Sequence, residues 1–189
     1  TFVAGILAAA TNNDGLLGVS PVQTKIMSVR AFKVVTDSSG SYIESSTTDI
    51  ANAIQFAVEH GADVINLSLQ SYFEPSEEEV SLLGDPTLKS AIQNAIQQGV
   101  FVVASQGNTD SSHSQLNFQE NQFKILPADY AYQMNGFMSV AAVDGATKKL
   151  ANFSFAHPEK TEIAAPGVNI YSAVMTGGNT YDKKSGTSF

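Results

Sequence analysis

The chain contains no cysteine, few basic residues and no long apolar run. Without cysteine the chain can form no disulfide and no Cys-ligated zinc site, and it has no thiol nucleophile. The absence of cysteine is compatible with secretion. The 10 lysines and arginines are scattered among 18 acidic side chains, so nucleic acid is not expected as a partner. The apolar opening, residues 2–10, is too short to span a bilayer, and no basic residue precedes it as in a signal peptide.

The residues that are present suit one globular domain. Of the 189 residues, 43% are hydrophobic and only 15% are charged, which is enough to bury a core of ordinary size. Apolar spacing, caps and turn residues predict helices over residues 1–10, 48–60 and 85–98, and strands over 25–34, 64–69, 100–104, 137–143, 162–165 and 168–174. For the helix over residues 48–60, Ser46 or Thr47 is the expected N-cap and Gly61 the stop signal.

The alternation of strands and helices predicts a parallel sheet with helices on its faces. In such sheets the functional loops lie beyond the carboxyl ends of the strands. Residues 68–70 and 104–108 follow two of the predicted strands. The sequence therefore directs attention to these two loops.

Nine stretches, taken together and in order, resemble the subtilisin-like serine peptidases. They are TFVAGILAA, NNDGLLGVSP, KIMSVRAF, ADVINLSL, GVFVVASQGN, LPADY, MSVAAVD, APGVNIYS and SGTSF. The resemblance implies a three-layer αβα fold with a mainly parallel sheet, truncated at both ends, with residues 1–189 forming part of a peptidase domain. It implies polypeptide substrates, no cofactor for catalysis, a monomer and a secreted protein.

The resemblance also implies a catalytic machinery. Ser188 matches the nucleophile of the Gly-Thr-Ser motif, at the start of a helix, and Asn108 matches the side chain that donates to the oxyanion. Thr1 falls just after the position of the catalytic histidine. Because that histidine and the aspartate before it would precede the chain, the chain by itself is expected to be inactive. A serine hydroxyl needs such a base to become a nucleophile.

Substrate binding is carried over from the same resemblance. Two backbone segments are expected to hold the peptide as an added strand, and the second of them forms a pocket with a third segment. The segments are Ser39, Gly40 and Ser41; Ser68, Leu69 and Gln70; and Ala104, Ser105, Gln106 and Gly107. The family usually has glycine where Gln70 stands and a small residue where Gln106 stands. Phe189 takes the place of a common methionine.

Each of these residues also has an ordinary structural interpretation. Ser188 alone would suit a helix N-cap, and Asn108 after Gly107 would suit a turn. His60 suits a helix C-terminus, while His113 and His157 lie in polar loops, and replacement of the missing base by any of the three is not expected.

Two further functions and one metal site stay open on the sequence. The first alternative is a non-catalytic relative that only binds peptides. The second, a nucleotide-binding α/β protein, is weaker because no glycine-rich phosphate motif follows a strand. Asn12, Asn13 and Asp14 could supply oxygens to a structural calcium ion, as the corresponding loop does in the family. The acidic run Glu77 to Glu79 is interpreted as a solvated surface.

Overall fold

The computed structural model describes residues 1–11, 15–22, 24–38, 40–73, 86–175 and 180–189. Within these ranges, no helix combines the length and the apolar character needed to cross a membrane.

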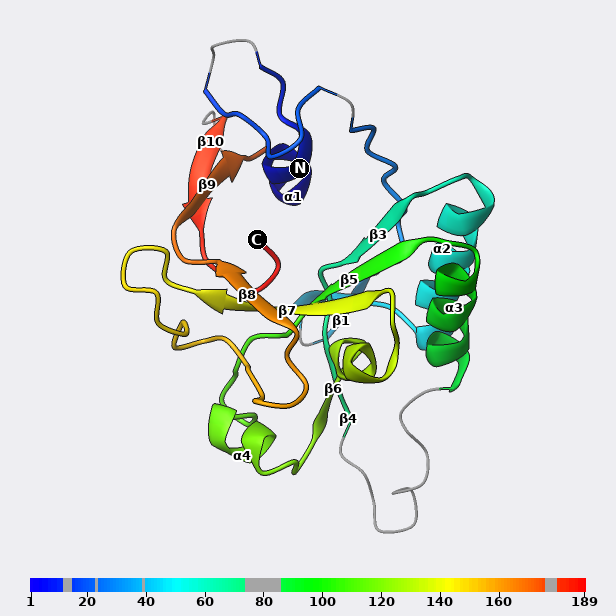
Figure 1. Cartoon of the computed structure of the whole chain (residues 1–189), viewed down its shortest axis with the longest axis vertical. Coiled ribbons are helices and arrows are strands. Elements are labelled where there is room, and N and C mark those ends of the chain that lie inside the picture. Colours follow the sequence, from blue (N-terminus) through cyan, green and yellow to red (C-terminus); the bar gives the residue numbers. More distant parts are fainter. Residues whose placement is uncertain (12–14, 23, 39, 74–85, 176–179) are drawn as a thin grey trace.

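A four-stranded parallel sheet in the order β3, β5, β7, β8 forms the centre of the molecule (Figure 1). Its strands are β3 (Val64–Leu67), β5 (Phe101–Ser105), β7 (Phe137–Val143) and β8 (Ile163–Pro166). Neighbours pair in parallel, with Leu67 opposite Ala104 and Ala104 opposite Ser139. The predicted α/β class with a parallel sheet is confirmed. Because the strands run the same way, the loops that follow them leave from one edge of the sheet.

Two helices, α2 (Thr47–Glu59) and α3 (Pro86–Gln97), lie side by side and share a core with the sheet (Figure 1). Helix α2 begins at a capping box. The Ser46 Oγ accepts a hydrogen bond from the Asp49 N–H at 3.0 Å, and the Asp49 carboxylate accepts one from the Ser46 N–H at 3.4 Å. The apolar residues that join the helices to β3 and β5 are Ile50, Ile54, Ala57, Leu88, Ile92, Ala95, Ile65 and Val102.

Smaller elements surround this core. They are α1 (Phe2–Ala8), α4 (Gln115–Gln119), the 3-10 helix η1 (Ala128–Gln133), and the antiparallel pairs β1 (Lys33–Asp37) with β2 (Gly40–Glu44), β4 (Ser71–Phe73) with β6 (Lys124–Leu126), and β9 (Ile170–Ala173) with β10 (Tyr181–Lys184). Helix α1 contacts β9, and the Phe2 and Phe189 ring centroids are 4.5 Å apart. Helix α1 and the C-terminal end of the chain thus lie close together (Figure 1).

The predicted strand over residues 25–34 is wrong. Residues 25–32 form neither helix nor strand, and pairing begins only at Lys33, which lies opposite Glu44. Ile26 and Met27 are 45% and 41% exposed. β-branched and aromatic residues favour a strand only where a neighbouring strand and a packed face are available. In the same hairpin, Asp37 lies opposite Gly40.

Candidate active site

Three segments that are distant in sequence meet beyond the carboxyl ends of β3 and β5. Ser68, which follows β3, donates a hydrogen bond from its Oγ to the backbone oxygen of Ser188 at 3.2 Å. Gly107, which follows β5, donates its N–H to the Thr187 Oγ1, also at 3.2 Å. The loops after β3 and β5, which the sequence indicated as functional, therefore both contact the Gly-Thr-Ser segment.

The side chain of Asn108 is anchored through its oxygen. Its Oδ1 accepts hydrogen bonds from the Thr187 backbone N–H at 3.0 Å and from the Thr187 Oγ1 at 3.2 Å. A carboxamide carries an acceptor oxygen and a donor NH₂ group. With the oxygen bonded to Thr187, the Nδ2 group is the part of this side chain that is left to donate.

Gly107 has to be glycine for two reasons. Its φ is +102°, in the region that side chains rarely adopt. A Cβ there would lie 3.0 Å from the Ile125 Cγ2 and 3.1 Å from the Gln70 Oε1. Because Gly107 has no side chain, the Gln70 carboxamide can reach both the backbone N–H and the backbone oxygen of Asn108.

Ser188 lies half-buried in a turn that is supported by β8. The Gly186 N–H donates to the Gly167 oxygen at 2.9 Å, and a Cβ on Gly167 would approach the Gly186 oxygen to 2.8 Å. The segments around Gly167 and Gly186 can approach each other this closely because Gly167 has no side chain. Residues 187 and 188 form a turn, in which the Phe189 N–H donates to the Gly186 oxygen at 3.4 Å. That Ser188 begins a helix stays a prediction.

The two predicted pocket walls are joined to each other. Ser105, which is buried at the end of β5, donates from its Oγ to the Leu69 oxygen at 3.4 Å. Ala104 is fully buried in the core. Gln106 is also fully buried, and its Oε1 accepts a hydrogen bond from the Thr161 Oγ1 at 3.0 Å. Its Nε2 has no hydrogen-bond partner among the described residues.

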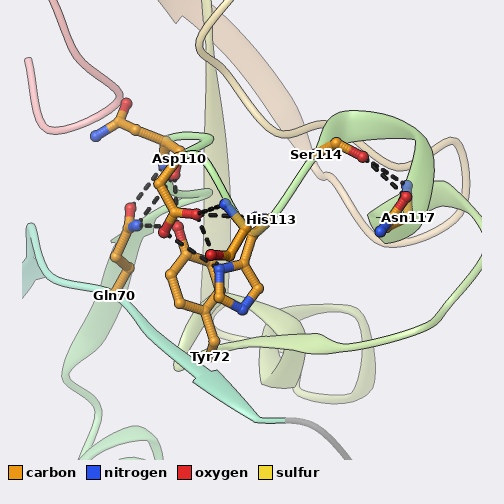
Figure 2. Close-up of polar contacts among 8 residues, drawn as sticks. Gln70, Tyr72, Asp110, His113, Ser114 and Asn117 are labelled. Carbon is orange, nitrogen blue, oxygen red and sulfur yellow. Dashed lines mark hydrogen bonds and ion pairs between the residues drawn. The ribbon is translucent and has the colours of Figure 1, made fainter.

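Gln70 and Tyr72 hold the main chain of Asn108 (Figure 2). The Gln70 Oε1 accepts from the Asn108 N–H at 2.6 Å, and the Gln70 Nε2 donates to the Asn108 oxygen at 3.0 Å. The Tyr72 hydroxyl donates to the same oxygen at 2.8 Å. The sequence singled out Gln70 as unusual but did not indicate Tyr72.

A histidine and a carboxylate support Tyr72 (Figure 2). The His113 ring stacks on the Tyr72 ring, with centroids 3.6 Å apart and planes at 4°. The His113 Nδ1 lies 3.0 Å from the Asp110 Oδ1. Backbone N–H groups, first that of Ser112 and then that of His113, lower the pKa of Asp110 to about 2. Burial, followed by the nearby Asp110 carboxylate, raises the pKa of Tyr72 to about 12.

Comparison with known proteins identifies the family. The model of the subtilase family matches residues 1–189, that is, the whole chain. The chain belongs to the subtilase family. It is 38% identical over 189 residues to subtilisin DY from Bacillus licheniformis, and also 38% identical to a thermophilic serine proteinase from Bacillus sp. strain AK1. All of this chain aligns in both cases, but it spans only 57% and 38% of those proteins.

A solved subtilase structure supports the same fold. The epidermin leader peptide processing serine protease from Staphylococcus aureus superposes with a TM-score of 0.73 at 26% identity. The match covers the whole of this chain and 48% of that one. The family and fold expected from the sequence resemblance are thus confirmed.

The first predicted substrate segment of this subtilase, residues 39–41, lies in a different part of the fold from the other two. Gly40 and Ser41 belong to the β1–β2 hairpin, where Gly40 pairs with Asp37 and the Ser41 Oγ lies 2.8 Å from the Thr36 Oγ1. Ser39 is outside the described residues. Whether this segment binds a peptide stays a prediction.

The three histidines of this subtilase make their described contacts away from Ser188. The His60 Nδ1 lies 2.8 Å from the Phe56 oxygen, and the two rings stack. The His157 Nδ1 accepts from the Glu159 N–H at 3.1 Å, and burial lowers the pKa of His157. His113 is held by the ring and carboxylate described above. Each ring is thus placed by its own neighbours. That none of the three replaces the catalytic base stays a prediction.

The predicted calcium ligands Asn12, Asn13 and Asp14, like the acidic run from Glu77 to Glu79, lie outside the described residues. In the part of the chain that the structure describes, no cluster of three or more His, Asp or Glu side chains is placed to hold a metal ion. The calcium site stays a prediction.

Proposed function

We propose that the protein containing this chain is a serine endopeptidase in which Ser188 is the nucleophile and Asn108 helps to form the oxyanion hole. The single observation that carries this proposal is the anchoring of the Asn108 Oδ1 by Thr187, the residue immediately before Ser188. That contact couples the candidate donor directly to the candidate nucleophile. Membership of the subtilase family supplies the reaction class.

The proposed reaction proceeds through an acyl-enzyme. The Ser188 Oγ attacks the carbonyl carbon of a peptide bond while a histidine takes its proton. The negative oxygen of the tetrahedral intermediate accepts hydrogen bonds from the Asn108 Nδ2 and the Ser188 backbone N–H. The histidine gives the proton to the nitrogen of the leaving amine, whose expulsion leaves an ester on Ser188, and water then hydrolyses this ester. Side chains, the Ser188 backbone N–H and water supply all of these steps, so we propose that no cofactor takes part.

The histidine and the aspartate that orients it are proposed to lie before Thr1 in the same protein. Residues 1–189 alone would then hold the nucleophile and the oxyanion donor without a base, and would be inactive. In line with the family resemblance, polypeptides are the proposed substrates and the extracellular space is the proposed location.

A fluorophosphonate probe tests this function on the complete protein. Such probes phosphonylate a serine only when it is activated as a nucleophile. We expect label on the peptide that contains Ser188, and loss of that label in Ser188→Ala. The matched control is Ser90→Ala, which changes an exposed serine of α3 and should leave labelling intact.

Absence of label on folded, complete protein would overturn the peptidase proposal. It would favour a subtilase that binds peptides without cleaving them.

A further inference from the structure

The Gln70 side chain forms two hydrogen bonds with the main chain of a single residue, Asn108. Its Oε1 accepts from the Asn108 N–H at 2.6 Å, while its Nε2 donates to the Asn108 oxygen at 3.0 Å. Because the carboxamide is planar and presents both groups, the pair of bonds fixes the orientation of the Asn108 backbone as well as its position.

The Tyr72 hydroxyl closes a ring of hydrogen bonds around this contact. It accepts from the Gln70 Nε2 at 2.7 Å and donates to the Asn108 oxygen at 2.8 Å. The Tyr72 ring stacks on His113 (Figure 2). This stacking and an edge contact with Phe123, at 5.6 Å between centroids, limit the movement of the Tyr72 ring. Because its pKa is about 12, the hydroxyl keeps its proton at neutral and mildly alkaline pH.

Asn108 is therefore held from two sides. Gln70 and Tyr72 hold its main chain, and Thr187 holds its side-chain oxygen. With both ends of the residue fixed, rotation of the carboxamide is restricted and its Nδ2 is held in one direction. A donor that is fixed before the reaction stabilises developing charge without the cost of reorganisation.

Gln70 can reach Asn108 only because of its neighbours. A Cβ on Gly107 would lie 3.1 Å from the Gln70 Oε1, so glycine leaves the space that this side chain occupies. The family usually has glycine after Ser-Leu, at the position of Gln70. A glycine there has no carboxamide and could make neither hydrogen bond.

We propose that Gln70 is a positioning residue that clamps the main chain of Asn108 and thereby aims the Asn108 amide at the oxyanion. This inference rests on the proposed peptidase function. Gln70 does not touch the reacting atoms in this scheme and acts only through Asn108. Misplacement of a catalytic group by about 1 Å can slow a reaction about 10²-fold.

Steady-state kinetics on a chromogenic peptide amide test the proposal in the complete protein. Gln70→Met preserves the length of the side chain and removes both hydrogen bonds. We expect kcat to fall about tenfold while KM changes less than about twofold, because the loss is confined to the transition state. Gln93→Ala, at an exposed position of α3, is the matched control and should match the wild type.

A double-mutant cycle separates positioning from general damage to the fold. If Gln70 acts through Asn108, then Gln70→Met added to Asn108→Ala should lower kcat less than about twofold further. Unchanged kcat in the single variant would overturn the proposal. So would an equal loss in both backgrounds, because that loss would not pass through Asn108.

Ser188→Ala distinguishes failure of this inference from failure of the function. If the wild-type protein has no turnover, or if turnover survives Ser188→Ala, the peptidase proposal fails and the positioning role fails with it. Turnover that depends on Ser188 but is unaffected by Gln70→Met refutes the positioning role alone. Thermal melting of each variant confirms that the compared proteins are folded.

Discussion

Two polar clusters of this subtilase, one half-buried around Asn108 and one buried at Asp129, satisfy their polar groups in different ways. Around Asn108, the main-chain N–H, the main-chain oxygen and the side-chain oxygen are all paired with neutral partners at 2.6 to 3.2 Å. Asp129 in η1 is only 3% exposed, yet neither carboxylate oxygen has a well-formed hydrogen bond among the described residues. Its nearest charged partner is the Lys160 Nζ at 3.7 Å.

The difference shows what matched neutral partners achieve. Buried neutral groups with partners at normal distances cost little and define one geometry. A buried carboxylate with a distant cation keeps much of its desolvation cost. Burial therefore raises the pKa of Asp129 to about 6, although Lys160 acts in the opposite direction. The first cluster suits a site that must be rigid, and the second makes stability depend on pH.

Asn108→Ala breaks the first cluster at its centre and should have the largest effect. We expect kcat to fall about 10²–10³-fold, equivalent to about 2.7–4 kcal/mol, which is the loss known for removal of an oxyanion-hole amide in a subtilisin. Steady-state kinetics measure it, and Asn52→Ala, at an exposed position of α2, is the matched control. Wild-type kcat in Asn108→Ala would remove Asn108 from the oxyanion hole.

Asp129→Asn removes the charge of the second cluster. Between pH 4 and 6 the folded protein binds more protons than the unfolded chain, because the pKa of Asp129 rises on folding from 3.8 to about 6. This carboxyl group therefore lowers the free energy of unfolding as pH rises through that window, by about 3 kcal/mol in total.

Urea denaturation between pH 4 and 8 measures the effect of Asp129→Asn. The variant should gain stability relative to the wild type as pH rises from 4 to 6, and the difference should level off above pH 7. Asp63→Asn, at an exposed position, is the control. Parallel curves for Asp129→Asn and the wild type would show that burial of Asp129 imposes no such dependence.

Gly107→Ala intrudes on the first cluster without removing a polar group. We expect a loss of about 2 kcal/mol in the free energy of unfolding, because φ is +102° and the new methyl group meets Ile125 and Gln70. Gly99→Ala is the control that separates backbone strain from crowding, because Gly99 has φ +83° but no atom lies within 4 Å of an added Cβ. Equal losses in the two variants would mean that crowding at Gly107 contributes nothing.

Tyr72→Phe should have the smallest effect. It removes the hydroxyl that links Gln70 to Asn108 while leaving the ring that stacks on His113. We expect about 1 kcal/mol of stability to be lost, and kcat to fall less than in Gln70→Met, because the two hydrogen bonds between Gln70 and the Asn108 main chain remain. A larger fall in kcat than in Gln70→Met would make Tyr72 the main support of Asn108.

Local signals in the sequence were enough for the helices α2 and α3 and the strands of the central sheet. Ser46 and Gly61 marked the ends of α2, and apolar spacing located α3. The rule that functional loops lie beyond the carboxyl ends of parallel strands indicates residues 68–70 and 104–108 from the sequence alone. Residues 25–32 misled the prediction because their β-forming side chains lack a paired strand in the described structure.

The support of Asn108 could not be predicted in the same way. Tyr72, Asp110 and His113 carry no motif, and each is ordinary in a surface loop. Their roles come from contacts between segments that are far apart in the chain, namely β4 and the loop before α4 (Figure 2).

The sequence by itself determined the family, the helices and strands of the core, and the residue types at Ser188 and Asn108, because these depend on local propensity and on motifs in a fixed order. Only the tertiary structure decided which way the Asn108 carboxamide is anchored, what Gln70 does there, and that Asp129 is buried. Hydrogen-bond partners and exclusion of water arise when distant segments pack together, so neither can be read from the neighbours of a residue along the chain.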